Sequence, residues 1–232
     1  MAFDGILITA ASRKGGCGKS MLVRVIAGEL AHRENKVGVI DCDPQRSLAS
    51  WSIESQELGL LPKEISLRTA ADIEGVRAAL DELQNCDVVI ADTPGVGSAM
   101  TISLCTLSDL VLVPVRPAKD DADGATQMIE MLRKAVAGQP QKPDVRVVYS
   151  AMQQTDRNAA SLRRAVEILH DNDIEHLTTA LWHRPTYANM AAAGGTAYTM
   201  TSGSETALEK ARLNGRVLVD EISTILENGG DA

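Results

Sequence analysis

The apolar residues of this chain follow two alternating patterns. Nearly continuous apolar runs are typical of strands buried on both faces of a parallel sheet, whereas apolar residues three and four positions apart are typical of helices. The first pattern predicts strands at residues 5–10, 36–41, 65–68, 87–92, 110–115, 145–149 and 178–182. The second pattern predicts helices from residue 20 onward and over residues 47–58, 72–83, 125–136, 162–169 and 205–226, the last with a break at Asn214-Gly215.

Strands that alternate with helices indicate an α/β fold. We expect a doubly wound, mainly parallel β-sheet flanked by helices on both faces. The chain has 232 residues, and no segment rich in Pro, Ser or charge divides it. The sequence therefore predicts a single domain over residues 1–232, with a flexible tail at 227–232. Sheets of this kind bind ligands at the carboxyl ends of their strands.

The charge of the chain limits its partners. Lys and Arg number 23 against 31 Asp and Glu, which gives a formal net charge of −8. This acidity disfavours nucleic-acid binding by the whole surface, so any DNA contact must be a local basic patch. The N-terminus shows no basic segment followed by an apolar one, and no apolar run approaches the about 18 residues that span a bilayer. We therefore expect a cytoplasmic protein that does not attach to a membrane.

The segment between the first strand and the first helix has the composition of a phosphate-binding loop. It reads Lys14-Gly15-Gly16-Cys17-Gly18-Lys19-Ser20. Glycines allow successive backbone N–H groups to turn toward an anion, the following helix adds the positive end of its dipole, and Lys19 adds a mobile charge. Ser20 is then placed to ligate Mg²⁺. The loop departs from the P-loop pattern G-x-x-x-x-G-K-[ST], because Arg13 stands at the first Gly position and Lys14 lies inside the loop.

Two motifs with acidic residues follow predicted strands. Asp41-Cys42-Asp43-Pro44-Gln45 comes at the end of strand 36–41, and Asp92-Thr93-Pro94-Gly95 at the end of strand 87–92. We expect these residues at the carboxyl edge of the sheet, where ligands bind. Asp92 is the candidate to hold Mg²⁺ through one of its waters, and Gly95 is expected near the nucleotide. The alternative for Asp41 and Asp43 is a solvated turn with an Asx-type hydrogen bond.

Together these three motifs resemble those of the ParA/MinD family of ATPases. They are similar to its deviant Walker A box K-G-G-x-G-K-[ST], its switch I motif D-x-D-P-Q and its switch II motif. The resemblance covers residues 5–97 and continues more loosely to about residue 226. It implies an ATPase that uses ATP and Mg²⁺, in which Lys19 and the loop bind the phosphates, Asp43 positions the attacking water and Asp41 supports Asp43 from behind.

The resemblance gives Lys14 a separate role. It matches the signature lysine that reaches the phosphates of the partner subunit's nucleotide in an ATP-sandwich homodimer, much as an arginine finger does. Hydrolysis would then be slow in the single chain and coupled to dimerisation. The alternative is a solvated surface lysine. We expect ATP as the nucleotide, because the chain lacks the N-K-x-D motif that selects guanine.

Missing features narrow the resemblance within the family. The chain lacks a C-terminal tyrosine cluster, a C-x-x-C pair and a basic amphipathic C-terminal helix. What remains resembles a small ParA-type partition ATPase, whose ATP-bound dimers hold nonspecific DNA until a centromere-bound partner stimulates hydrolysis. The DNA-binding candidates are Arg163, Arg164, Lys210, Arg212 and Arg216. These residues could instead pair with acidic neighbours on solvated helix faces, and so few charges would bind DNA weakly and with strong salt dependence.

Three other functions stay open on the sequence. A VirC-type accessory ATPase of conjugative DNA transfer shares the small size and the deviant loop. A ParA-like protein can also position protein clusters instead of DNA. The third alternative is of another class, a nucleotide-binding adaptor that does not hydrolyse ATP. The intact set of Lys19, Ser20, Asp43 and Asp92 argues against such an adaptor.

Overall fold

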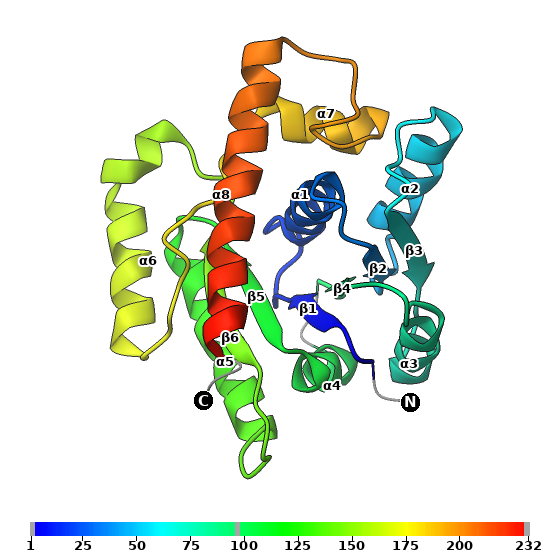
Figure 1. Ribbon diagram of the computed structural model, residues 1–232. Helices are drawn as coiled ribbons and strands as arrows, with labels where there is room; N and C mark the ends of the chain where they lie inside the picture. The colour runs from blue at the N-terminus through cyan, green and yellow to red at the C-terminus, as the bar shows by residue number, and fades with distance from the viewer. Residues whose placement is uncertain (1–2, 96–97, 230–232) are drawn as a thin grey trace.

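A single parallel sheet forms the centre of the molecule. The structure is a computed structural model that describes residues 3–95 and 98–229. Across the sheet the strands follow the order β3-β2-β4-β1-β5-β6, and every neighbouring pair is parallel, which confirms the predicted α/β fold (Figure 1). The strands are β1 (Ile6–Ala10), β2 (Val37–Asp41), β3 (Ile65–Thr69), β4 (Val88–Asp92), β5 (Leu110–Val115) and β6 (Asp144–Tyr149).

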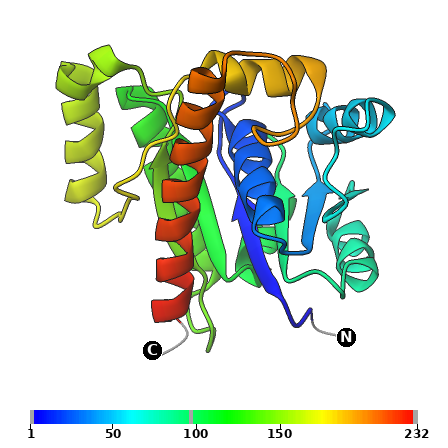
Figure 2. The ribbon, with the colours of Figure 1, turned by 45° about the horizontal axis from the view of Figure 1, so that its top comes forward.

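Helices cover both faces of this sheet (Figure 2). One face carries α1 (Lys19–His32), α2 (Ser47–Glu57), α7 (Pro185–Ala193) and α8 (Glu205–Gly229). The other carries α3 (Ile73–Glu82), α4 (Ala99–Leu107), α5 (Lys119–Ala135) and α6 (Ala160–Asp171), with a 3₁₀ helix, η1 (Gln154–Asn158), before α6. Ile8 packs into the first layer and its neighbour Leu7 into the second. Strand positions are thus buried on both faces, which explains the continuous apolar runs.

The predicted strand at 178–182 is wrong. Within this segment Trp182 makes an isolated bridge to Met152, beyond the end of β6, and His176, just before the segment, makes another to Val147 of β6. Side chains of α8 take backbone groups that a seventh strand would need for pairing. Glu221 accepts hydrogen bonds from the N–H groups of Thr178 and Thr179, and Asn214 bonds to Trp182 and Ala180. The segment is therefore an extended connection fastened to a helix instead of a member of the sheet.

The predicted break at Asn214-Gly215 is also wrong, because α8 continues through it. Asn214 uses its side chain for the bonds to residues 180 and 182, so it does not compete for its own helical backbone. A Cβ at position 215 would lie 3.3 Å from Val25 Cγ1, so glycine allows α8 to pack closely on α1. Residues 227–229 of the predicted tail lie in α8, and residues 230–232 lie outside the described residues.

The sequence patterns did not indicate α4 or α7. Helix α4 follows the switch II motif and is apolar on nearly all sides, so it shows no stripe, and its start is marked by Ser98, which accepts a hydrogen bond from Thr101 N–H at 3.2 Å. Helix α7 begins with Pro185 and is rich in alanine. Among residues 3–95 and 98–229, no helix has both the length and the apolar character needed to cross a membrane.

Candidate functional site

The three sequence motifs meet at the carboxyl edge of the sheet. The parallel register pairs Asp92 at the end of β4 with Ala10 at the end of β1 and with Asp41 at the end of β2. The loop from Ala11 to Gly18 follows Ala10 directly and leads into α1. The fold therefore places the loop, the first acidic motif and the second acidic motif side by side.

The loop has the backbone geometry of an anion-binding turn. Gly16 and Gly18 have φ angles of 75° and 98°, a region that side chains strongly disfavour. Gly18 is the N-cap of α1, and no side chain caps this helix, so the first N–H groups of α1 are available to a bound anion. A Cβ added at Gly15 or Gly16 would meet no atom within 4 Å, which leaves open space against the loop. This arrangement fits the phosphates of a nucleotide.

Lys19 and Ser20 lie at the start of α1 and point into the site. Lys19 is only 5% exposed, and its Nζ donates a hydrogen bond to Ser12 Oγ at 3.3 Å. Ser20 Oγ donates to Asp92 Oδ2 at 2.5 Å. The hydroxyl and the carboxylate predicted to hold Mg²⁺ are therefore in direct contact.

The environment of Asp92 fits a bound metal ion. Asp92 is fully buried, and its second oxygen, Oδ1, has no hydrogen-bond partner. Burial raises the pKa of Asp92 to about 7, although the hydrogen bond from Ser20 and the charge of Lys19 lower it. A buried carboxylate oxygen without a partner is costly unless a cation or a donor completes it. Carboxylate and hydroxyl oxygens are the ligands that Mg²⁺ prefers, so these residues fit that ion.

The two aspartates of the first acidic motif have different surroundings. Asp41 is buried and accepts three backbone N–H bonds: from Asp43 at 3.1 Å, from Leu48 at 3.0 Å and from Ala49 at 2.9 Å. Asp43 is half-buried, and its Oδ1 accepts a bond from Gln45 N–H at 2.9 Å. The Asx-type bond considered as an alternative is thus present at Asp43. Asp41 anchors the turn that carries Asp43, and the Asp43 carboxylate remains accessible at the edge of the sheet.

The second acidic motif closes against the phosphate loop. A Cβ on Gly95 would lie 3.1 Å from Gly15 Cα, so only glycine allows the two segments to approach so closely. Thr93 before it is buried and donates from Oγ1 to Ala10 O at 3.1 Å. Gly95 therefore packs against the phosphate loop, and its contact with a nucleotide stays a prediction.

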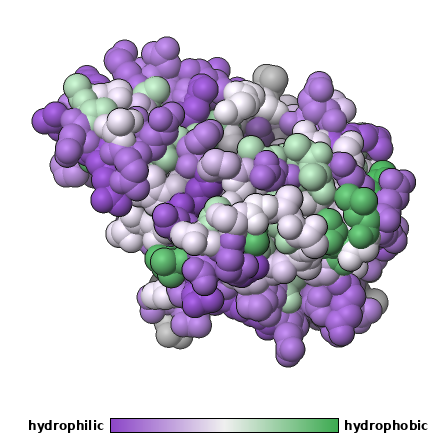
Figure 3. All heavy atoms as spheres, turned by 90° about the horizontal axis from the view of Figure 1, so that it is seen from above, coloured by the Kyte–Doolittle hydropathy of each residue, from purple (hydrophilic) through white to green (hydrophobic). Residues whose placement is uncertain are grey.

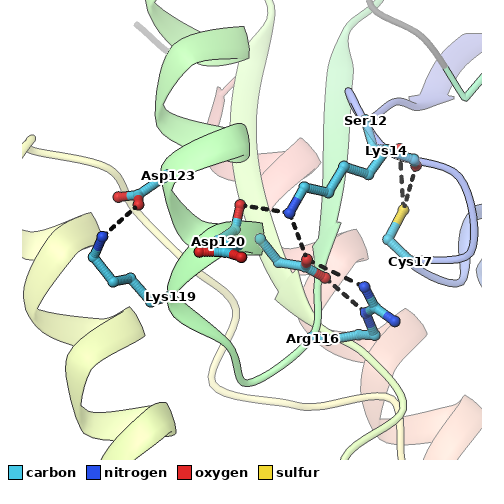
Figure 4. Close-up of polar contacts among 8 residues, drawn as sticks. Ser12, Lys14, Cys17, Arg116, Lys119, Asp120 and Asp123 are labelled. Carbon is cyan, nitrogen blue, oxygen red and sulfur yellow. Dashed lines mark hydrogen bonds and ion pairs between the residues drawn. The ribbon is translucent and has the colours of Figure 1, made fainter.

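The Lys14 side chain contacts the start of α5, whereas the Lys19 side chain contacts Ser12 of the loop. The Lys14 side chain is 44% exposed, and its Nζ donates to Asp120 O at 3.0 Å and contacts Asp121 Oδ1 at 3.3 Å (Figure 4). Asp121 also accepts a bond from Arg116 Nε at 2.7 Å. Burial alone would raise the pKa of Asp121, but Arg116 and Lys14 outweigh it and hold this pKa below its usual value. Within one chain, Lys14 is therefore neither free in solvent nor directed at its own phosphate loop.

Several residues at the site escaped sequence reasoning. Asp121 lies 107 positions after Lys14 and belongs to no motif, and Ser150, whose Oγ donates to Cys17 O at 2.5 Å, follows another strand. Cys17 is buried, and its thiol donates to Ser12 Oγ at 3.0 Å. Arg24 could have been found, because it lies four residues after Ser20 and so one helical turn along the same face of α1.

The predicted DNA-binding residues lie on two helices. Figure 3 shows mainly hydrophilic side chains over α6, at the left of that view, and hydrophobic ones at the right. Ile53 of α2 and Leu58, which follows α2, are exposed. Arg164 of α6 pairs with Glu167 at 2.9 Å, and Arg212 of α8 pairs with Glu205 at 2.6 Å. The exposed Arg163 donates to Asn158 O at 3.0 Å. These arginines have partners within the chain, and their DNA-binding role, like that of Lys210 and Arg216, stays a prediction.

Comparison with known proteins places the chain in a family. The sequence model of the family described as VirC1 protein matches residues 6–227. Protein ParA of Rhizobium radiobacter is 29% identical over 197 residues, which are 84% of this chain and 86% of that protein. The maintenance of carboxysome distribution protein A of Halothiobacillus neapolitanus is 28% identical over 221 residues, 94% of each chain.

A solved structure shares the fold. The MinC:MinD cell division protein complex of Aquifex aeolicus gives a TM-score of 0.67 at 20% identity, and the match covers 93% of this chain and 96% of that chain. The chain therefore belongs to the VirC1 family, within the P-loop ATPases of the ParA/MinD type.

Proposed function

We propose that this protein is an ATP-dependent switch of the ParA type, which positions or segregates DNA. It dimerises around bound ATP, hydrolyses the ATP slowly with Mg²⁺, and returns to a single chain. The observation that carries this proposal is that two lysines of one loop, Lys14 and Lys19, differ in burial and in the groups they contact. Lys19 is buried over its own phosphate loop, whereas Lys14 is half exposed on the outer side and held only by groups at the start of α5.

The residues divide the work of hydrolysis. Backbone N–H groups from Gly16 to Lys19 and the ammonium of Lys19 bind the β- and γ-phosphates. Ser20 and Asp92 would hold Mg²⁺, which would supply charge compensation on those phosphates. Asp43 orients the attacking water, and its turn is anchored by the three hydrogen bonds to Asp41.

Lys14 completes the site of the partner subunit. In the single chain, the half-exposed Lys14 donates to Asp120 O and contacts Asp121, a carboxylate whose side chain is only 5% exposed and which also accepts a bond from Arg116. An ATP γ-phosphate offers Lys14 a stronger electrostatic partner in a water-excluded interface. Hydrolysis then depends on dimerisation, which makes the protein a timer more than a metabolic catalyst.

Partition or positioning is the cellular role that the relatives support. Protein ParA and the carboxysome distribution protein both align with most of this chain. In our proposal the ATP-bound dimer holds nonspecific DNA of the nucleoid, and a centromere-binding or other partner protein stimulates hydrolysis and release. Because each chain carries a formal net charge of −8, the dimer binds DNA through a local patch, weakly and with strong salt dependence.

A second candidate is an accessory ATPase of conjugative DNA transfer. The match of the VirC1 family model to residues 6–227 favours it. Both candidates share the ATP switch and differ in cargo. A neighbouring gene for a small DNA-binding protein would favour partition, whereas genes for a relaxase and a coupling protein would favour transfer.

Size-exclusion chromatography with light scattering tests the switch. Wild type and Lys14→Ala are compared with ADP, with ATP and without nucleotide, at low and high salt, with and without nonspecific duplex DNA. We expect a dimer only with ATP, no dimer with Lys14→Ala, and a DNA shift only by the dimer at low salt. If the dimer forms but does not bind DNA at any salt concentration, the ATP-dependent switch still stands. The protein would then be expected to position protein complexes instead of DNA. An ATP-bound wild type that stays a single chain would refute the proposal.

A further inference from the structure

A buried arginine lies between the phosphate loop and the first acidic motif. Arg24 projects from α1 one turn after Ser20 and is only 6% exposed. Arginine is almost never this deeply buried without a specific partner. Its Nη2 donates to Ser47 O at 2.8 Å, and its guanidinium lies 5.9 Å from the centroid of the Trp51 ring. Both partners belong to α2, the helix that follows the Asp43 turn.

Within residues 3–95 and 98–229, Arg24 makes no direct ion pair, although the charges of Asp92 and Asp41 act on it. Burial lowers the pKa of Arg24, whereas the charges of Asp92 and Asp41 raise it. Nε is buried and has no hydrogen-bond partner. The structure thus keeps a costly cation close to two buried carboxylates without joining it to either of them.

Arg24 and Asp41 fix the same turn from opposite sides. The Asp41 carboxylate accepts bonds from Asp43 N–H before the turn and from Leu48 and Ala49 N–H after it. Arg24 holds the carbonyl of Ser47 at the first position of α2. Residues 43–47 are therefore clamped at both ends by a carboxylate and a guanidinium, which leaves the Asp43 side chain little freedom of position.

Resting on the ATPase function proposed above, we propose that Arg24 is a positioning residue for hydrolysis. It fixes the turn that carries Asp43 and offsets the negative charge of Asp41 and Asp92 at the metal position. A residue that only tethered α2 to α1 would affect stability and activity together. A positioning residue changes turnover and cation affinity beyond its effect on stability.

The variants are Arg24→Met, which keeps the length and removes the charge, and Arg24→Lys, which keeps the charge. Ser55→Ala is the matched control, because Ser55 Oγ fastens the other end of α2 by accepting a bond from Gly195 N–H at 2.8 Å. Each variant is measured for kcat, for affinity toward the fluorescent nucleotide mant-ATP, for Mn²⁺ binding by electron paramagnetic resonance, and for Tm.

We expect Arg24→Met to lower kcat by roughly 10- to 100-fold while mant-ATP affinity stays within about threefold, because the loop is untouched and Asp43 is misplaced. Removal of the cation should tighten Mn²⁺ binding by roughly three- to tenfold. Arg24→Lys should restore wild-type Mn²⁺ affinity and part of kcat. Ser55→Ala should lower Tm with kcat and Mn²⁺ affinity close to wild type.

Two results together would overturn the positioning role. Arg24→Met would bind Mn²⁺ as wild type does, and it would lose no more kcat than Ser55→Ala does at equal Tm. A failure of the proposed function looks different. In that case wild type itself binds no mant-ATP or releases no phosphate, and the role of Arg24 in hydrolysis falls with it.

Discussion

The phosphate loop has an inner half, which ends at Lys19 and Ser20, and an outer half, which contains Lys14, and the two halves differ in how firmly the protein holds their side chains. On the inner side, Lys19 is 5% exposed and Ser20 contacts a fully buried carboxylate, so the positions of these side chains are set by the core of the fold. On the outer side, the Lys14 side chain is 44% exposed and is held by a carbonyl and a carboxylate of α5. The carboxylate is that of Asp121, which is buried and keeps Arg116 as a second partner when Lys14 leaves it. In our proposal, the loop binds its own nucleotide through Lys19 and releases Lys14 to the partner subunit.

The largest expected effects come from replacing each of the two lysines with alanine. We expect Lys19→Ala to weaken mant-ATP binding by roughly 100-fold, because it removes a charge-assisted contact to phosphate. Lys14→Ala should keep nucleotide affinity within about threefold and lower hydrolysis by roughly 1,000-fold, as the loss of a cation supplied in trans does. Fluorescence titration and phosphate release measure these effects. Similar losses of affinity in both variants would erase the distinction between the two halves.

Asp41 and Asp43 of the first acidic motif should also differ, one affecting stability and the other hydrolysis. Asp43→Ala should slow hydrolysis by roughly 100-fold and prolong the ATP-bound dimer, because the water loses its orienting carboxylate. Asp41→Ala should instead lower the free energy of unfolding by about 1–3 kcal/mol, since three buried N–H groups lose their acceptor. Single-turnover kinetics and urea unfolding separate the two. If Asp43→Ala hydrolyses ATP at the wild-type rate, its water-positioning role is wrong.

Two glycines test how firmly the inner loop is set. Gly18→Ala places a side chain at a φ of 98° and should lower the free energy of unfolding by about 1–2 kcal/mol. Gly15→Ala should change it by less than about 0.5 kcal/mol, because its Cβ would meet nothing within 4 Å. Urea denaturation without nucleotide measures both. Equal destabilisation would mean that the outer loop is as constrained as the inner one.

The smallest expected effect concerns the release of Lys14. Asp121→Asn removes the charge that holds Lys14 and should lower the protein concentration needed for the ATP-bound dimer by roughly two- to fivefold. Asp123→Asn is the matched control, because Asp123 pairs with Lys119 at 3.3 Å on the same helix (Figure 4). Light scattering over a concentration series gives the midpoints. Weaker dimerisation of Asp121→Asn would show that Asp121 supports the dimer instead of restraining Lys14.

The sequence predicts what depends on short spacing and on the rule that parallel strands end at one edge. Asp41 and Asp92 each follow a recognisable apolar strand, so their meeting beside the loop could be expected before the structure. The strand predicted at 178–182 failed because Asn214 and Glu221, more than 30 positions away, take its backbone groups.

Long-range contacts explain the rest of what the sequence hides. The partner of Lys14, Asp121, stands in a segment with several acidic residues, and nothing local distinguishes it from Asp120 or Asp123. Arg24 lies on a helix whose apolar stripe predicts only packing, and its contact with Ser47 depends on how α1 and α2 are placed by the sheet. Spacing can therefore indicate the phosphate site, whereas the contacts that restrain and position it require the tertiary structure.

A mixing experiment tests most directly whether Lys14 acts on the partner subunit. Lys14→Ala lacks the lysine but has an intact Asp43, and Asp43→Ala supplies Lys14 but cannot orient water. Each variant alone should hydrolyse ATP at least roughly 100-fold more slowly than wild type. An equal mixture should regain a measurable part of the wild-type rate, at most about one half, because each mixed dimer contains one Lys14 and one complete site. A mixture no faster than the two variants apart would contradict the account, since Lys14 would then act within its own subunit.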